Sequence, residues 1–204
     1  TGEQGSGMTI RDMEQRDLDA VVEIHRTAFP GFFLTRMGRQ FLRAYYETAL
    51  DYAPTIALVC EEQPGSALRG FVVGFREPQG FYALFSARRR RLLPAIFRAV
   101  LSDPGLLRAI LRNMRRVADQ AEHPVDAAEL ASIGVDGQGR GAGGRLVEEF
   151  CERAAANGLR TVVLTTDAEE NDSVRTFYER RGFVLDGFED RGDRRLCRYV
   201  RAVG

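Results

Sequence analysis

Hydrophobic and polar positions recur with two different spacings along the chain, and these spacings divide it into helices and strands. Apolar residues fall three or four positions apart over residues 18–28 and 38–50, which predicts two amphipathic helices. Short apolar runs at 55–60 and 70–75 flank Pro64-Gly65, which suits the central pair of a type II turn and predicts a β-hairpin. Both hairpin strands carry apolar residues on each face, so we expect this sheet to be covered on both sides.

The chain opens with further elements of the same two kinds. Residues 9–11 are strand-like, and Asp17 suits the N-cap of the first helix, which should end near Phe29-Pro30. Residues 31–35 then form an apolar connector. Its aromatic side chains belong either to the core or to the wall of a substrate pocket, and core is favoured because exposed aromatic clusters are uncommon.

The second half of the chain predicts a β-α-β unit followed by a helix and two strands. The unit consists of a strand at 128–135, a helix at 142–156 closed by Gly158, and a strand at 161–166. The later helix should begin at Asn171 or Asp172 and end near Arg181, and the final strands should lie at 182–188 and 194–203.

A basic segment at 86–122 interrupts this order. It contains nine arginines between 88 and 116, four of them in the run Arg88 to Arg91, and two helical patterns separated by Asp103-Pro104-Gly105. One interpretation is an amphipathic helical pair with a solvated basic face. The other is a lid or docking surface for an anionic substrate or partner. A role at a membrane surface is a third, less favoured interpretation.

Composition limits the class of protein. The length of 204 residues, with 44% hydrophobic and 28% charged residues, predicts one globular domain at 8–204 that carries the helical insertion. Basic and acidic residues balance at 29 each, so the net charge argues neither for nor against nucleic acid, and no nucleic-acid partner is included among the expected ones. No apolar run is long enough for a membrane span. Residues 1–7 are small and polar and suggest a tag remnant or disordered start before Met8.

The cysteines and histidines point to reduced thiols and no metal. Cys60, Cys151 and Cys197 are odd in number and widely spaced, which favours buried thiols in a cytoplasmic protein over a disulfide framework. Two histidines are too few for most zinc sites.

Residues 129–144 hold the strongest chemical signal. A strand runs into a segment with six glycines, and a helix follows at once. Glycine lets the backbone approach another molecule closely, and the unpaired N–H groups that open a helix attract phosphate oxygens. A Walker loop needs a lysine, and the chain has none. Gly139-Arg-Gly141-Ala-Gly-Gly144 satisfies the dinucleotide fingerprint formally, but its late position and surroundings make that interpretation weak.

A third interpretation explains more residues. Gln138-Gly-Arg-Gly141-Ala-Gly143 resembles the Gln/Arg-x-x-Gly-x-Gly/Ala signature of the GNAT superfamily of acyl-CoA-dependent N-acetyltransferases. The stretch Asn171-Asp-Ser-Val-Arg-Thr-Phe-Tyr178-Glu-Arg-Arg-Gly-Phe183 is similar to that family's next motif. The resemblance is specific over about 128–185 and weaker over 8–77. The spacing from Val135 to Gln138 is two residues shorter than is usual in the family.

The resemblance implies an α/β (α+β) fold with a mixed, splayed central sheet flanked by helices, and acetyl-CoA bound in the splay. It places the pantetheine amides on Ile133 and Val135 and the diphosphate on the backbone N–H groups of the glycine-rich segment. The implied cofactor-binding residues are Ile133, Gly134, Val135, Gln138, Gly139, Arg140, Gly141, Ala142, Gly143, Gly144, Asn171, Ser173 and Tyr178.

The resemblance also assigns catalytic roles. Tyr178 stands at the family's usual tyrosine and is expected to act as general acid toward the departing thiolate; the alternative is that it merely packs. Glu129 stands where several members place a catalytic glutamate, and the alternative is a surface acid at a strand end. Further candidates for the base are His25, Asp167 and Glu169. The N–H of Val135 is the expected oxyanion donor.

The expected activity is transfer of an acetyl group from acetyl-CoA to a primary amine, with a small molecule such as an amino sugar as the favoured acceptor. A longer or carrier-protein-bound acyl donor is an alternative, and so is a non-catalytic acyl-CoA sensor or docking module. The sequence leaves open whether the protein forms a homodimer.

Overall fold

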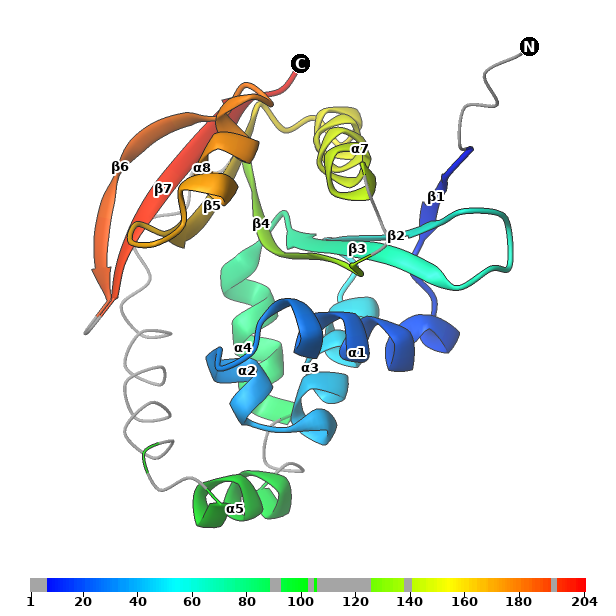
Figure 1. Cartoon of the computed structure of the whole chain (residues 1–204), viewed down its shortest axis with the longest axis vertical. Helices are drawn as coiled ribbons and strands as arrows, with labels where there is room; N and C mark the ends of the chain where they lie inside the picture. Colours follow the sequence, from blue (N-terminus) through cyan, green and yellow to red (C-terminus); the bar gives the residue numbers. More distant parts are fainter. Residues whose placement is uncertain (1–6, 89–92, 103–104, 106–125, 138–140, 192–193) are drawn as a thin grey trace.

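The computed structural model is built around one seven-stranded mixed sheet with helices on both of its faces (Figure 1). The strand order is β1-β2-β3-β4-β5-β7-β6. The structure describes residues 7–88, 93–102, 105, 126–137, 141–191 and 194–204. This architecture confirms the mixed, helix-flanked sheet expected from the sequence.

The elements keep close to the predicted boundaries. The described strands are β1 (Thr9–Asp12), β2 (Thr55–Glu61), β3 (Leu68–Phe75), β4 (Ala127–Val135), β5 (Thr161–Asp167), β6 (Val184–Arg191) and β7 (Arg194–Ala202). The described helices are η1 (Gln15–Asp17), α1 (Leu18–Ala28), α2 (Phe33–Arg36), α3 (Arg39–Asp51), α4 (Pro78–Arg88), α5 (Leu93–Ser102), α7 (Ala142–Ala156) and α8 (Asp172–Glu179).

The sheet consists of two antiparallel halves joined by a short parallel pairing. Strands β1 to β4 pair antiparallel with their neighbours, and so do β5, β7 and β6. The two halves meet where β4 and β5 run parallel, and that pairing covers only Ala127↔Thr161 to Glu129↔Val163. Beyond it the strands separate, and in Figure 1 the half formed by β5, β6 and β7 curves away from the other half.

Each face of the sheet has its own apolar core, as the two-sided apolar pattern of the hairpin predicts. On one face α7 packs its apolar side, including Leu146 and Phe150, against the strands. On the other face α1, α3 and α4 bury a second cluster that contains Tyr46, Phe71 and Phe81. Helices therefore cover both faces.

The hairpin turn is the one the sequence predicts. Gly65 has φ +81°, and the N–H of Ser66 donates to the carbonyl oxygen of Gln63 at 2.9 Å. This is the geometry of a type II turn with Pro64-Gly65 at its centre, in which only glycine holds the third position without strain. Gly158 (φ +79°) and Gly182 (φ +76°) likewise follow the ends of α7 and α8.

Three expectations need correction or completion. Helix α4 is absent from the sequence-based prediction, because apolar residues on all its sides leave no periodic stripe. Asp17 does occupy the N-cap position of α1, but its carboxylate makes no capping bond there; it accepts from Arg11 and from the N–H of Glu14 instead. Of the two helical patterns in the basic segment, the first is α5, and the second lies outside the described residues.

Candidate functional site

The separation of β4 from β5 opens a gap lined by backbone groups. Residues Leu130–Val135 of β4 pair with β3 on one side only, and residues Leu164–Asp167 of β5 pair with β7 on one side only. The edges that face the gap are therefore available to an extended ligand, which can add to a strand edge through its amides. Ile133 and Val135, the predicted pantetheine partners, lie on this free edge of β4.

The gap leads to the N-terminus of α7. Gly141 is the N-cap residue in the left-handed conformation (φ 85°), and the first bond of the helix runs from the N–H of Arg145 to the carbonyl oxygen of Gly141. The N–H groups of Gly141, Ala142, Gly143 and Gly144 therefore lack partners within the helix. The first turn contains no acidic residue, so the positive end of the helix dipole is free to attract an anion. Gln138, Gly139 and Arg140 lie outside the described residues.

An arginine lies beside this helix end. The guanidinium of Arg181 packs so closely on Gly144 that a Cβ at that position would overlap it. It also stacks on the ring of Phe177 at 3.7 Å and donates from Nη1 to the carbonyl oxygen of Phe177 at 2.8 Å. Its Nε is buried without a partner among the described residues. A cation at the positive end of a helix is favourable only with an anion between them, so the arrangement suits a phosphate.

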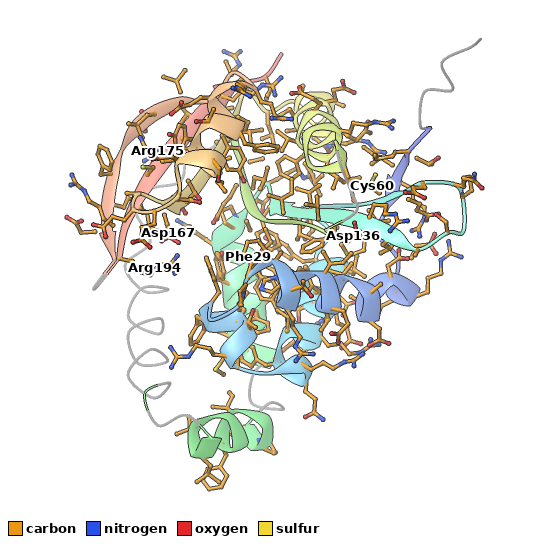
Figure 2. All side chains as sticks on the ribbon, viewed as in Figure 1. Phe29, Cys60, Asp136, Asp167, Arg175 and Arg194 are labelled. Carbon is orange, nitrogen blue, oxygen red and sulfur yellow. The ribbon has the colours of Figure 1, made fainter. Side chains whose placement is uncertain are left out.

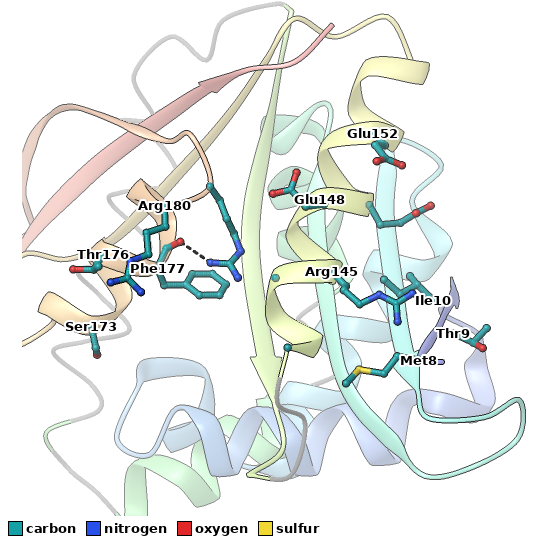
Figure 3. A pocket seen from close by; sticks show the side chains of 14 residues that line it. Met8, Thr9, Ile10, Arg145, Glu148, Glu152, Ser173, Thr176, Phe177 and Arg180 are labelled. Atoms are coloured by element: carbon teal, nitrogen blue, oxygen red, sulfur yellow. Dashed lines mark hydrogen bonds between the residues drawn. The ribbon is translucent and has the colours of Figure 1, made fainter. Parts of the chain in front are cut away.

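A pocket of about 1070 Å³ lies in front of α7 and α8 (Figure 3). Helix α7 contributes Gly141, Gly144 and Arg145, and α8 and the residues after it contribute Ser173, Thr176, Phe177, Arg180 and Arg181. Hydroxyls and guanidinium groups thus gather near the glycine-rich helix end. Ser173, a predicted binding residue, lies on this wall.

Tyr178 lies in α8 and is 6% exposed, with its ring against Phe177, Phe183 and Tyr199. Burial raises the pKa of its hydroxyl to about 12, and the nearby charge of Arg181 opposes that shift. The phenol is therefore protonated over the whole neutral range and can donate a hydrogen bond.

Asn171 holds the loop between β5 and α8. It is the N-cap residue of α8, but its side chain makes no capping bond. Its amide instead donates to Thr166 Oγ1 at 2.7 Å and to the carbonyl oxygen of Asp167 at 3.1 Å. The predicted capping role of this side chain is therefore wrong, and its observed role is to fix the end of β5 beside the gap.

A bulge in β4 decides which side chains share a face. Val73 of β3 is opposite Ser132, whereas the next residue, Gly74, is opposite Leu130, so Ala131 is the extra residue. Glu129 and Ser132 lie opposite Phe75 and Val73, and both of those belong to the cluster under α1 and α3. The bulge therefore directs Glu129 and Ser132 to the same face, where regular alternation would separate them.

Glu129 lies within electrostatic range of Tyr45. Burial raises the pKa of Tyr45, and the charges of Tyr82, Tyr46 and Glu129 raise it further. Glu129 is half-buried in β4 at the point where the two strands separate. It lies on the face of the sheet that α1 and α3 cover. Helix α7, with its anion-binding N-terminus, lies on the other face.

The structure adds a buried polar chain that the sequence does not reveal. His25 Nδ1 lies 2.6 Å from the hydroxyl of Tyr46, and that hydroxyl also has the Ser132 side chain as a hydrogen-bonding neighbour. His25 is 4% exposed, and burial lowers its pKa to about 4. Nothing in the periodic pattern links these three residues, because they come from α1, α3 and β4.

The remaining candidates for the base are less suited to the task. Asp167 forms a bidentate pair with Arg194, with distances of 2.6–2.8 Å, and Figure 2 shows the two side chains next to each other. The pair engages both oxygens of the Asp167 carboxylate. Glu169 is exposed. The guanidinium of Arg194 also lies 4.8 Å over the ring of Phe32, which places this connector aromatic at the surface.

The described part of the chain contains neither a metal-binding cluster nor a membrane-spanning helix. Among those residues no group of three or more His, Cys, Asp or Glu side chains is placed to hold a metal ion. None of the described helices has the length and apolar character that crossing a membrane requires.

Comparison with known proteins identifies the fold and a family model that matches part of the chain. Residues 110–183 match the model of the acetyltransferase (GNAT) family. A GNAT-family protein of Desulfovibrio desulfuricans is similar over 97% of this chain and 100% of its own, with a TM-score of 0.63 and 14% identity. An N-acetyltransferase of Staphylococcus aureus Mu50 is similar over 97% and 99%, with a TM-score of 0.60 and 18% identity.

A third structure was solved with a ligand. The yncA protein of Salmonella typhimurium, determined with its cofactor acetyl-CoA, is similar over 97% of this chain and 94% of its own, with a TM-score of 0.59 and 17% identity. No curated protein matches the sequence. The family-model match over residues 110–183 and the splayed sheet together show that the chain has the fold of the GNAT acetyltransferases.

Proposed function

We propose that the protein is an acetyl-CoA-dependent N-acetyltransferase that acetylates a primary amine. The observation that carries the proposal is the gap between β4 and β5, which ends at the bare N-terminus of α7 with Arg181 beside it. A thioester on a long amide-containing arm with a diphosphate at its end matches both features. The likeness to a protein solved with acetyl-CoA supports the same cofactor.

The free edge of β4 is the proposed site of the pantetheine arm. Its amides would pair with backbone groups of Ile133 and Val135, as a peptide pairs when it adds to a sheet. The diphosphate would accept from the N–H groups of Gly141 to Gly144, together with the predicted residues Gln138, Gly139 and Arg140. The pocket with Ser173 and Arg180 offers hydroxyl and guanidinium groups to the nucleotide end.

In the proposed reaction the neutral amine attacks the thioester carbonyl carbon. A C–N bond forms, the carbonyl electrons move to oxygen, and the N–H of Val135 donates to that oxyanion. Collapse of the tetrahedral intermediate breaks the C–S bond and releases the CoA thiolate. Glu129 accepts the surplus proton of the amine through water.

Tyr178 is the proposed donor to the leaving sulfur. With a pKa of about 12 the phenol holds its proton more tightly than a thiol near 8.5. Full transfer to the thiolate is therefore uphill, and the larger effect of Tyr178 is a hydrogen bond that stabilises the thiolate as it forms. The proton that completes the thiol is the one that Glu129 accepts from the amine, passed on by way of water.

The geometry of the site gives less information about the acceptor than about the cofactor. A small amine such as an amino sugar remains the favoured class. The arginine-rich segment around α5 lies between α4 and β4 in the chain and would suit an acceptor that carries a phosphate.

The test is a panel of amines with acetyl-CoA, read by release of free thiol and by the mass of the product. The panel contains ethanolamine, tyramine, glucosamine and a peptide with a free amino terminus, and octanoyl-CoA replaces acetyl-CoA in a second arm. We expect one thiol released for each amine acetylated, and faster transfer from acetyl-CoA. Binding of acetyl-CoA without transfer to any amine would instead indicate a non-catalytic acyl-CoA-binding protein.

A further inference from the structure

We propose that Ser132 binds the acceptor amine, and that Tyr46 and His25 are positioning residues that hold its hydroxyl in place. The inference rests on the proposed function and names a further residue of the same site. It begins from the bulge at Ala131, which places Ser132 on the face that also carries Glu129. Bulges are common beside active sites, where they redirect a side chain.

Ser132 is close to where the reaction would occur. The pairing of β4 with β5 ends at Glu129, so Ser132 belongs to the stretch of β4 that borders the gap. Glu129 and Ser132 are opposite Phe75 and Val73, which are two positions apart on β3, so their backbones are about 7 Å apart. A carboxylate and a hydroxyl at this separation can receive two N–H groups of one amine.

The hydrogen-bonded side chains behind Ser132 are polar groups in an apolar layer, and apolar packing alone does not explain them. Tyr46 is fully buried and His25 nearly so, and both contact the ring of Phe71 in an otherwise apolar layer. His25 Nε2 is buried with no hydrogen-bond partner among the described residues. An unsatisfied buried polar atom is destabilising and calls for a functional or solvent-based explanation, whereas phenylalanines would fill the same space without it.

The hydroxyl of Ser132 keeps hydrogen-bonding capacity for a ligand. A serine hydroxyl has one donor and two acceptor positions. If it donates to Tyr46, both lone pairs remain; if it accepts from Tyr46, one lone pair and the proton remain. In both directions at least one lone pair is left to accept an N–H of the amine. The low pKa of His25 keeps the imidazole neutral at pH 7, so the chain brings no second positive charge near an ammonium group.

The test measures steady-state kinetics with the panel amine that is acetylated fastest. We expect Ser132→Ala to raise the KM for that amine roughly tenfold, the effect of one lost hydrogen bond to a charged group, and to leave the KM for acetyl-CoA unchanged. Ser132→Thr, which keeps the hydroxyl, should restore most of the amine affinity. Tyr46→Phe should raise the amine KM several-fold while its kcat stays within about twofold.

Thr48→Val is the matched control, because Thr48 is a buried hydroxyl on α3 that donates within its own helix, to the carbonyl oxygen of Ala44 at 2.8 Å. It should change neither KM. An amine KM within twofold of the wild type in Ser132→Ala would overturn the inference, and so would an equal rise in both KM values. A loss of thermal stability in Tyr46→Phe with an unchanged amine KM would show that the hydrogen bonds from His25 through Tyr46 to Ser132 serve stability alone. Failure of the proposed function is distinct from these outcomes, because the wild type would then acetylate no amine.

Discussion

Tyr178 and His25 are both buried, and burial moves their pKa values in opposite directions. The pKa of Tyr178 rises to about 12, whereas that of His25 falls to about 4. Both shifts have the same cause, because an apolar environment disfavours the charged form of either group. At neutral pH the phenol therefore keeps its proton and the imidazole stays unprotonated, so each has a fixed hydrogen-bonding state.

The proposed role of Tyr178 predicts a defect in kcat. Tyr178→Phe keeps the ring contacts with Phe183 and Tyr199 and removes only the hydroxyl. We expect kcat to fall about 100-fold, the effect of removing one hydrogen-bond donor to a developing anion, with the KM for acetyl-CoA within twofold of the wild type. Tyr52→Phe is the control, because the hydroxyl of Tyr52, which follows α3, donates to the carbonyl oxygen of Glu77, just before α4. An unchanged kcat in Tyr178→Phe would leave that tyrosine as a packing residue.

The depressed pKa of His25 predicts how stability depends on pH. The unfolded chain binds a proton at His25 below pH 6.5, and the folded chain only below about pH 4. The stability contributed by the neutral imidazole is thus complete above pH 6.5 and is lost as the pH falls from 6.5 to 4. A shift of this size corresponds to about 3 kcal/mol.

Urea unfolding of the wild type and of His25→Phe at pH 7, 5.5 and 4.5 measures this contribution. The difference in unfolding free energy between the two proteins should change by about 2–3 kcal/mol across the series, in favour of the variant at low pH. The pKa of Asp17 is lowered from 3.8, so the stability that Asp17 contributes is lost only at a pH below this window. Parallel pH profiles would contradict the burial of a neutral imidazole.

At the level of elements, strand β4 organises the site because it is irregular in two ways. Its pairing with β5 stops after Glu129, and its pairing with β3 is shifted by the bulge at Ala131. The first irregularity exposes backbone groups to the cofactor gap. The second turns Ser132 toward the face of Glu129. A regular strand would do neither.

Gly74 is the residue on β3 that permits this close approach. It pairs with Leu130 at the register shift, and a Cβ there would overlap the carbonyl oxygen of Glu129 and the ring of Phe150. We expect Gly74→Ala to lower the free energy of unfolding by about 3 kcal/mol, because neither backbone nor a packed ring can move away cheaply. Gly187→Ala on β6, where a Cβ meets nothing within 4 Å, should stay within about 0.5 kcal/mol. Equal stability of the two variants in urea unfolding would refute the steric argument.

Considering the whole molecule, the predictable parts are those with a local signature. The type II turn, the β-α-β unit and the helix that begins after the glycines follow from spacing and from single residues such as Gly65 and Gly158. Helix α4 does not, because its apolar residues are spread around the helix and form no periodic stripe, although only Pro78 and Phe81 are buried. The bulge is invisible in the sequence, since the residues around Ala131 are small or apolar on both faces.

The candidate site divides in the same way. The glycine-rich helix end and Tyr178 lie in motifs and can be expected from the sequence. The contact of Arg181 with Gly144 and the chain from His25 through Tyr46 to Ser132 join residues that are distant along the chain. Such contacts depend on how the elements pack, and no local pattern encodes them.

The two halves of the sheet separate where β4 and β5 stop pairing, and we propose that acetyl-CoA binds in that gap. Gly143 tests it, because a Cβ at this position would lie 3.5 Å from both Val135 of β4 and Phe177 of α8, in the mouth of the gap. Gly143→Leu should therefore fill the gap while the fold persists. Ala156→Leu, on the exposed last residue of the same helix, is the control.

The decisive measurement is calorimetric titration of acetyl-CoA into the wild type, Gly143→Leu and Ala156→Leu. We expect one saturable site in the wild type and in Ala156→Leu, and binding of acetyl-CoA at least about tenfold weaker in Gly143→Leu. Equal affinity in all three proteins would place the cofactor elsewhere, and absence of binding to the wild type would contradict the account as a whole.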